Sequence, residues 1–311
     1  MKTILITGGA GFIGSHTADA LLQSGKRVII YDNLATGKLT NLDLFNPNLE
    51  FVPGDVLDYS KLAAQVKRAD AVLHLAALPS VQKSIENPIH SLQINTQGFL
   101  HVLEAIRESQ KAIRLVYASS AAIYGNDAEL PCRDDMSALE NAALSPYALD
   151  KANNERYADL FSRLYGIKSL ALRYFNVYGP RQDPSSPYAG VITKFIECYQ
   201  KQEEIVIWGD GKQSRDFIYV ADIARANVLA LENDCSEVFN IATGVPETLL
   251  NLLQYIEAAN GQPAKKHFAD ARAGDIRESY ACTKKAEQQL AFRYAINLKD
   301  GIQMLIATMV A

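Results

Sequence analysis

The sequence has few cysteines, and their spacing suits neither a metal site nor a disulfide framework. Cys132, Cys198, Cys235 and Cys282 are far apart and form no C-x-x-C pair, so separate core or surface thiols are the simpler interpretation. No apolar run reaches the roughly 18 residues of a membrane-spanning helix, and no signal-peptide pattern precedes the first strand-like segment. We therefore expect no metal, no membrane association and a reducing, cytoplasmic location.

The chain also lacks an excess of positive charge. Its formal net charge is −4, which provides no basic field for binding nucleic acid. The 311 residues are 48% hydrophobic and 21% charged, as in an ordinary globular protein, and the length is that of about two domains. An anionic ligand must therefore be held by local donors rather than by the overall charge.

Short apolar runs alternate with helix-like stretches in the first half of the chain. The runs are residues 3–7, 27–31, 49–52, 71–76, 113–118 and 168–173, and helical spacing occupies 12–24, 95–110 and 147–165. Strands that alternate with helices are typical of a parallel sheet covered on both faces. The sequence therefore predicts an α/β fold with a doubly wound parallel sheet.

The alternation changes after about residue 176. A loop rich in Pro, Ser and Gly (179–190) precedes an expected helix near 190–201 and an expected strand near 204–208. We expect one domain over residues 1–176 and a smaller C-terminal lobe over 177–311. The run VFNIATG (238–244) is expected to return to the sheet of the first domain, so that the first domain would include a segment from the second half of the chain.

A glycine-rich loop joins the first expected strand to the first expected helix. Gly8 permits a tight turn, Gly11 lets the backbone approach a pyrophosphate, and Gly14 lets the helix pack closely. The helix N-terminus then offers free N–H groups to the phosphate charge. Asp32 ends the next strand, 18 residues after Gly14. Its carboxylate suits the two ribose hydroxyls and would repel a 2′-phosphate, so the pattern favours NAD over NADP.

Another acidic residue follows the third strand in Gly54-Asp55-Val56. Asp55 is placed to accept a hydrogen bond from an adenine amino group, or simply to cap a turn. The spacing leaves both roles open.

Tyr147 and Lys151 lie four residues apart on an expected helix, so their side chains share one face. A free phenol is a poor base at neutral pH, but an adjacent ammonium favours the phenolate and lowers its pKa. Ser120 follows the strand at 113–118 and could hydrogen-bond the same substrate hydroxyl. The order of glycine loop, acidic strand end, serine and Tyr–Lys helix predicts proton transfer coupled to hydride transfer.

Ordered motifs cover nearly the whole chain. They are TGGAGFIGSH (7–16), YDNLATGK (31–38), HLAA (74–77), YASSAAIYG (117–125), SPYALDK (145–151), RYFNVYGPRQ (173–182), QSRDFIYVAD (213–222) and RAGDIRES (272–279). With these motifs the chain resembles the extended short-chain dehydrogenase/reductase family, and within it the NAD-dependent nucleotide-sugar epimerases and dehydratases. The resemblance implies a Rossmann-type sheet, a substrate-binding C-terminal lobe, NAD as cofactor and a UDP-sugar as substrate.

The resemblance also implies roles for single residues. Tyr147 transfers the proton, Ser120 binds the substrate hydroxyl, and Lys151 binds the nicotinamide ribose and tunes Tyr147. The further cofactor-binding residues implied are Phe12, Ile13, Asn33, Val56, Ala76, Asn95 and Tyr174. The substrate-binding residues implied are Ser80, Asn176, Arg215, Arg272, Asp275 and Ser279. For Tyr188 and Trp208 two roles stay open, bordering the nucleotide base or packing in the core. Two positions depart from the usual pattern, since Asp150 stands where a neutral residue is common and Pro79 where some members carry a lysine.

The reaction type follows from the two residues after Ser120. Dehydratases of this family typically carry an Asp-Glu pair at these positions, and the related decarboxylases a Glu at the second. Here both positions are alanine, Ala121 and Ala122, which cannot transfer a proton. The reaction expected from the remaining groups is 4-epimerisation of a hexose, with NAD regenerated in each cycle.

In such epimerases, a residue shortly after the R-x-G-D motif (272–275) determines which substituent at sugar C2 fits the site. Here it is Ser279, a small residue that leaves room for an N-acetyl group. We therefore expect UDP-GlcNAc and UDP-GalNAc as the substrate pair. The alternatives are a UDP-glucose 4-epimerase restricted to plain hexoses, a UDP-glucuronate 4-epimerase, a 4-keto-sugar reductase, and a non-catalytic nucleotide-sugar sensor.

A homodimer is also implied, because this family commonly pairs the helices 95–110 and 147–165 across a two-fold axis. Both stretches carry apolar residues beyond one stripe, namely Phe99, Leu100, Val102, Leu103, Leu160, Phe161 and Leu164. The alternative is a monomer that buries these residues itself.

Overall fold

The computed structural model of this chain describes residues 1–126, 128–136, 144–183, 190–271 and 276–310. In this part of the chain the largest sheet has seven parallel strands in the order β10-β6-β5-β4-β1-β2-β3. The strands are β1 (Thr3–Thr7), β2 (Arg27–Asp32), β3 (Leu49–Pro53), β4 (Ala71–His74), β5 (Arg114–Ser120), β6 (Ser169–Tyr174) and β10 (Val238–Ile241). The strand order reverses between β1 and β4, which is the crevice where such sheets bind ligands.

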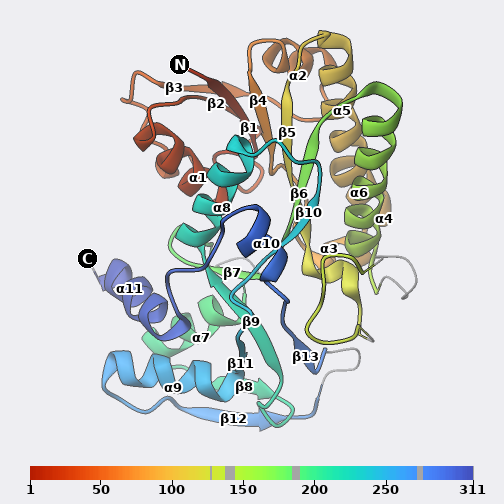
Figure 1. The fold of residues 1–311 in the computed structure, drawn as a ribbon. Coiled ribbons are helices and arrows are strands. Elements are labelled where there is room, and N and C mark those ends of the chain that lie inside the picture. The colour runs from red at the N-terminus through yellow and green to blue at the C-terminus, as the bar shows by residue number, and fades with distance from the viewer. Residues whose placement is uncertain (127, 137–143, 184–189, 272–275, 311) are drawn as a thin grey trace.

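Helices cover both faces of this sheet (Figure 1). On one face lie α1 (Phe12–Gln23) and α8 (Val220–Glu232), and on the other lie α2 (Tyr59–Val66), α5 (Gly98–Ser109) and α6 (Pro146–Tyr165). Shorter elements lead into α5 and α6: α3 (Val81–Glu86), α4 (Pro88–Leu92) and a π-helical turn η2 (Gln93–Gln97), while 3-10 turns stand at η1 (Leu39–Asn41) and η3 (Ala121–Tyr124). The predicted Rossmann-type α/β fold is confirmed.

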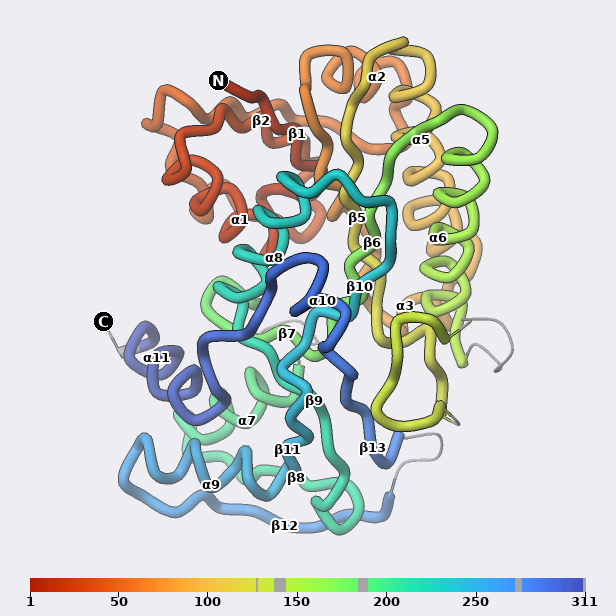
Figure 2. The backbone as a smooth tube through the Cα atoms, in the orientation of Figure 1, coloured from red at the N-terminus to blue at the C-terminus, as the bar shows by residue number. Residues whose placement is uncertain are grey.

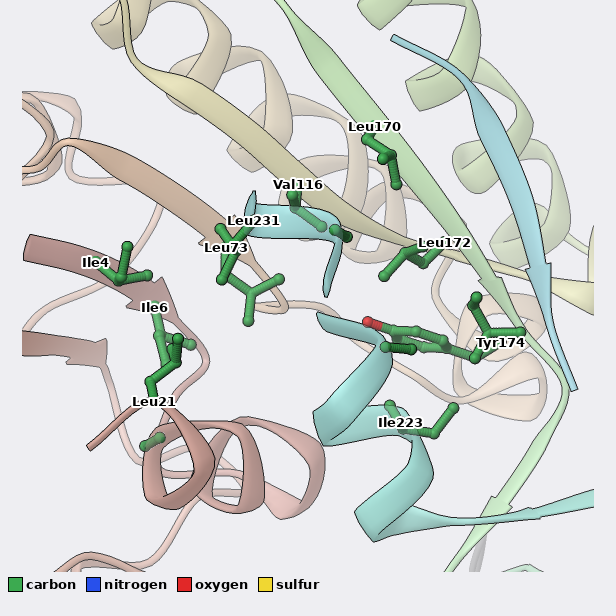
Figure 3. Packing of buried hydrophobic residues seen from close by; sticks show 14 of the residues in the cluster. Ile4, Ile6, Leu21, Leu73, Val116, Leu170, Leu172, Tyr174, Ile223 and Leu231 are labelled. Atoms are coloured by element: carbon green, nitrogen blue, oxygen red, sulfur yellow. The ribbon is translucent and has the colours of Figure 1, made fainter. Parts of the chain in front are cut away.

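The central strands are buried on both faces, so each face has its own apolar cluster. Residues that alternate along β1 divide between the clusters: Ile4 and Ile6 face α1 and α8, while Leu5 faces α2 and α5. Figure 3 shows the first cluster, in which Leu172 of β6 lies on the sheet side and Ile223 of α8 on the helix side. This alternation is the period of two that a strand imposes, and it explains why the strands are continuous apolar runs.

The C-terminal half forms a second lobe with its own apolar cluster (Figure 2). Its strands are β7 (Asn176–Tyr178), β8 (Ile205–Trp208), β9 (Ser214–Tyr219), β11 (Pro246–Thr248), β12 (Lys266–Ala269) and β13 (Glu278–Ser279). Its helices are α7 (Val191–Gln200), α9 (Leu249–Asn260) and α11 (Leu298–Val310), while α10 (Lys284–Gln289) packs near β10. The predicted boundary at residue 176 stays a prediction, although β10 pairs with β6 in the main sheet.

Two details differ from the sequence-based expectation. The helix expected at 95–110 begins as a π-helical turn and becomes regular only at Gly98. Phe99, Val102 and Leu103, which the dimer prediction counts as apolar residues available to a partner, are fully buried in the chain's own core against the sheet. These three residues therefore give no support to a dimer.

No helix among the described residues is both long and apolar enough to cross a membrane. Within the same residues, no group of three or more His, Cys, Asp or Glu side chains is arranged to hold a metal ion.

Candidate active site

The glycine loop lies between β1 and α1, as the sequence predicts. Gly8 has a φ of +71°, and a Cβ there would lie 2.7 Å from the backbone nitrogen of Ala76. A Cβ on Gly14 would lie 2.4 Å from the carbonyl oxygen of Gly8, so the start of α1 packs closely against the loop itself. A larger residue at Gly8 would push the loop away from the end of β4, and one at Gly14 would push α1 away from the loop.

The N-terminus of α1 has the features of an anion site. Gly11 is its N-cap residue, and no hydrogen bond from a described side chain caps the helix there. A Cβ on Gly11 would meet only the carbonyl oxygen of Gly8, at 3.2 Å. The backbone of Phe12 and Ile13 opens the helix at this point, and such N–H groups together with the helix dipole favour a phosphate.

Asp32 lies at the carboxyl end of β2 with its side chain held by backbone donors. The N–H of Ala10 donates to one carboxylate oxygen at 2.9 Å, and the N–H of Leu34 donates to the other at 2.8 Å. Burial raises the pKa of Asp32, and these two hydrogen bonds oppose that effect. The carboxylate is thus fixed beside the glycine loop, and each oxygen retains a lone pair for a ribose hydroxyl.

Asp55 does cap a turn, the simpler of its two predicted roles. It accepts hydrogen bonds from the N–H of Leu57 and from the side-chain amide of Asn33, both at 2.9 Å. Val56 is buried, and its carbonyl oxygen is bonded to the ring of His101. The carboxylate and amide lie together just past the ends of β2 and β3, and their contact with adenine stays a prediction.

These residues fit a dinucleotide such as NAD. The uncapped start of α1 suits a pyrophosphate, the fixed Asp32 carboxylate suits ribose hydroxyls, and Ala76 closes the loop from the end of β4. All three features lie at the carboxyl ends of parallel strands, around the point where the strand order reverses.

The predicted catalytic residues are close together at the next strand along the sheet. Ser120 is the last residue of β5, two residues later than the expected strand end. Tyr147 and Lys151 are on the first turns of α6, and the Lys151 nitrogen lies 5.8 Å from the centre of the Tyr147 ring. Lys151 donates a hydrogen bond to the carbonyl oxygen of Ala118 at 2.9 Å. Ser84 anchors the start of α6, because its hydroxyl accepts the Tyr147 N–H at 3.1 Å.

Burial acts on both titratable groups of this cluster. It raises the pKa of Tyr147, while a hydrogen bond with Ser120 lowers that pKa and the charge of Asp150 raises it. Burial lowers the pKa of Lys151 to about 8, and the charges of Asp150 and Glu155 oppose the shift. Before any ligand binds, Tyr147 is therefore a neutral phenol, and a nearby positive charge is needed to turn it into a base.

Asn95 lies in the π-helical turn and is buried beside α6. Its side-chain oxygen accepts the N–H of Leu78 at 2.8 Å. Its backbone carbonyl accepts a hydrogen bond from the side chain of Asn154 at 2.9 Å. Ser80 is the N-cap of α3 and accepts the N–H of Lys83 at 3.1 Å. Both predicted residues thus hold the loop that follows β4, and their contacts with ligands stay predictions.

Tyr174 is more deeply buried than its predicted place near the nicotinamide suggests. Figure 3 shows its ring between Leu172 and Ile223, and its hydroxyl donates to the side-chain oxygen of Asn227 at 2.6 Å. Asn227 in turn donates to the hydroxyl of Thr17 at 2.9 Å. The phenol therefore ties β6 to α8 and α1, and its contact with the nicotinamide stays a prediction.

Three of the predicted substrate-binding residues lie on β9 or on a strand paired with it. Arg215 on β9 pairs in register with Ser279 on β13, so the two side chains project to the same face. Asn176 on β7 donates to the backbone carbonyl of Asp216 at 3.3 Å. Trp208, at the end of β8, is 38% exposed. Tyr188, Arg272 and Asp275 lie outside the described residues.

Sequence reasoning missed two side chains that support the site. His74 at the end of β4 shares a hydrogen bond of 2.8 Å with the Thr7 hydroxyl, and burial lowers its pKa to about 3. Asp216 accepts the N–H and hydroxyl of Thr243, the N–H of Gly244 and the N–H of Ala281 at 2.7–3.3 Å. Both stand inside the quoted motifs, but only the tertiary structure shows their partners.

Three known proteins were found to be similar over nearly the whole chain. A putative UDP-glucose 4-epimerase from Methanocaldococcus jannaschii is 42% identical over 97% of each chain. The structure of a UDP-N-acetylglucosamine 4-epimerase from Methanobrevibacter ruminantium, in complex with UDP-N-acetylmuramic acid, is 38% identical with a TM-score of 0.94, covering 99% of this chain and 98% of that one. The structure of a UDP-glucose 4-epimerase from Thermotoga maritima with UDP-glucose is 36% identical with a TM-score of 0.92 and the same coverage.

The family comparison agrees with the geometry at the strand ends. Residues 4–242 match the NAD dependent epimerase/dehydratase family. This match spans the glycine loop, Asp32, Ser120 and the Tyr147–Lys151 pair, and it confirms NAD as the predicted cofactor. The chain belongs to the NAD-dependent epimerase/dehydratase family of enzymes.

Proposed function

We propose that this chain catalyses the reversible 4-epimerisation of a UDP-hexose, with UDP-GlcNAc and UDP-GalNAc as the preferred pair. UDP-glucose and UDP-galactose would be turned over more slowly. The observation that carries the reaction type is the 3-10 turn η3, which places Ala121 and Ala122 directly after Ser120. Methyl groups transfer no proton, so this turn supplies neither the acid and base of a dehydratase nor the glutamate of a decarboxylase.

The groups that remain for proton transfer are those around Tyr147. The chemistry that NAD supplies when bound is removal of hydride from C4 of the hexose and its return to the opposite face. Tyr147 would take the proton of the C4 hydroxyl and give it back, while Ser120 hydrogen-bonds the same oxygen. Lys151 in its ammonium form would stabilise the Tyr147 phenolate. The 4-keto sugar must turn over between the two hydride transfers.

The preference for an N-acetyl group rests on the small residue beside Arg215. Ser279 pairs with Arg215 across β13 and β9 and is only partly buried. A serine there leaves room beside the sugar that a tyrosine would fill. The similarity to the Methanobrevibacter UDP-N-acetylglucosamine 4-epimerase supports this preference.

Replacing Ser279 with tyrosine tests the preference. The Ser279→Tyr variant should lose turnover of UDP-GlcNAc selectively and retain turnover of UDP-glucose. Ser279→Ala is the matched control, since it keeps the side chain small and should leave both activities in place. Equal loss on both substrates, or no loss on either, would count against a gate at this position.

The second candidate is a UDP-glucose 4-epimerase with a tighter pocket. It shares the mechanism above, and the Thermotoga relative with UDP-glucose supports it at almost the same identity. Retained turnover of UDP-glucose with none of UDP-GlcNAc in the unaltered protein would select it.

We also propose that the active form is a homodimer that pairs α5 and α6 with their copies. Leu92 on α4 and Leu149 and Leu164 on α6 are 52%, 41% and 61% exposed. These leucines lie on helices that pack beside one another, since α4 contacts α6. A second copy would remove this apolar surface from water, which favours association.

A further inference from the structure

Asp150 is a buried carboxylate next to the catalytic lysine in sequence, and the mechanism above does not use it. It is 3% exposed. Its oxygens accept hydrogen bonds from the hydroxyl of Ser91 at 2.6 Å, the amide of Asn95 at 3.2 Å and the hydroxyl of Thr96 at 3.3 Å. All three donors are neutral and come from α4 and the π-helical turn η2.

These hydrogen bonds connect the catalytic helix to the loop after β4. Asn95 donates to Asp150 and accepts the N–H of Leu78 at 2.8 Å. Leu78 lies between Ala76, which abuts the glycine loop, and Ser80, which caps α3. The position of Asp150 therefore fixes Asn95, and Asn95 fixes the loop that faces the cofactor crevice.

The charged groups that act on Lys151 differ in whether an ion pair already compensates their charge. The titratable groups around it are Asp150, Tyr147 and Glu155 on α6 and His74 on β4, while its contact on β5 is a neutral carbonyl. Glu155 is paired with Arg173 of β6 at 2.7 Å, and His74 is held neutral by burial. Among the described ion pairs, none includes Asp150. Its negative charge is thus the one most available to Lys151.

We propose that Asp150 is a positioning residue that holds Asn95 and the loop after β4 against α6, and that its charge keeps Lys151 in the ammonium form. A neutral amine would not stabilise the Tyr147 phenolate, so this charge sets whether the Tyr–Lys pair is ready to act. The proposal rests on the Tyr147–Lys151 pair and not on which UDP-sugar is the substrate.

The physical need for such a charge follows from burial. Lys151 is 3% exposed, and burial lowers its pKa to about 8 even with Asp150 present. Without the carboxylate the pKa would fall further, and a large fraction of the lysine would be neutral near pH 7. The same charge raises the pKa of Tyr147. Asp150 therefore stabilises the Lys151 ammonium directly. It disfavours the Tyr147 phenolate, which then depends on the Lys151 ammonium for its stabilisation.

The test is a titration of Lys151 that needs neither substrate nor cofactor. In protein labelled with [ε-¹³C]lysine, the Lys151 resonance should titrate near pH 8, well apart from ordinary lysines near 10.4, and be absent from Lys151→Met. In Asp150→Asn this midpoint should fall by roughly one pH unit. Asparagine keeps the shape, and the hydroxyls of Ser91 and Thr96 can rotate to pair with it.

Asp159→Asn is the matched control. It removes the same charge from the same helix, but Asp159 is exposed and paired with Arg163 at 3.0 Å. The Lys151 midpoint should not move in this variant. Asp150→Glu, which keeps the charge, should hold the midpoint close to that of the unaltered protein.

An unchanged Lys151 midpoint in Asp150→Asn would overturn the proposal, whatever happens to stability or turnover. If Asp150→Asn does not fold, Asp150→Ser is titrated instead, with the same two outcomes. Failure of the proposed epimerase activity would leave this result intact, because the titration reads the lysine alone. Asp150→Ala removes the acceptor of Ser91, Asn95 and Thr96, so it should lower the affinity for NAD, measured by calorimetry. An unchanged affinity in this variant would overturn the positioning of the loop after β4.

Discussion

Lys151 holds its ammonium nitrogen 5.8 Å from the centre of the Tyr147 ring, one turn further along α6. The carbonyl oxygen of Ala118 accepts a hydrogen bond from that nitrogen at 2.9 Å, which anchors the lysine to β5. The charge on Lys151 is thus held in a fixed place relative to the phenol.

Tyr147→Phe should reduce epimerisation by roughly 100- to 10,000-fold, the usual contribution of a general acid–base group. The ring is kept and only the proton-transferring oxygen is removed, so binding of NAD should persist. Turnover is followed by NMR, and bound NAD by its absorbance after release from denatured protein. Turnover within a few-fold of the unaltered enzyme would contradict the role given to Tyr147.

Asp32→Ala should weaken binding of NAD by roughly 10- to 100-fold, because hydrogen bonds to a charged acceptor are lost. The substitution also leaves the N–H groups of Ala10 and Leu34 without their acceptor. Asp58→Ala is the control, since Asp58 likewise accepts a backbone N–H, at the start of α2, but lies at a helix cap. Calorimetry with NAD checks both variants, and equal affinity in Asp32→Ala and Asp58→Ala would count against the ribose contact.

His74 should make the protein less stable as the pH falls. Burial lowers its folded-state pKa from 6.5 to about 3, so between these values the unfolded chain binds a proton that the folded chain does not. Stability from this group is present above about pH 6.5 and is lost as the pH falls toward 3, by about 2 kcal/mol at pH 5. Urea unfolding at pH 7 and pH 5 measures the loss, and His74→Gln should show a smaller loss. Equal pH dependence in the two proteins would contradict a buried neutral histidine.

A substitution on α6 should separate the proposed dimer. Leu164 is 61% exposed, so glutamate there places a charge in the expected interface while barely affecting one chain alone. Light scattering should give twice the chain mass for the unaltered protein and the mass of one chain for Leu164→Glu. Phe45→Glu is the control, because Phe45 is 99% exposed in the segment between η1 and β3. A monomer in the unaltered protein would refute the dimer.

Local sequence signals were sufficient for the first strand–loop–helix unit and for the placement of Tyr147 and Lys151 on one face of a helix. Gly8 needs its positive φ and Asp32 ends a buried strand, and both facts depend on neighbours in sequence. Tyr147 and Lys151 share a face because they are one helical turn apart. The main sheet also followed from the alternation of apolar runs with helices.

The sequence could not reveal features that depend on partners far along the chain. Ser91, Thr96 and Asp150 meet only because α4, η2 and α6 pack together. The pairing of Arg215 with Ser279 depends on the register of β13. This strand has only two residues, which are too few to show an alternation of apolar and polar side chains in the sequence. Phe99 looked available for a partner chain, since periodicity does not tell which apolar face the protein's own sheet covers.

The proposed reaction is tested by proton NMR of the purified protein with UDP-GlcNAc and no added NAD, with UDP-glucose in a parallel sample. The account predicts that UDP-GalNAc appears, because retained NAD, Tyr147, Ser120 and Lys151 are sufficient for 4-epimerisation. Conversion of UDP-glucose alone would keep the mechanism and remove the role given to Ser279. No conversion of either sugar, even after NAD is added, would contradict the proposed 4-epimerase activity.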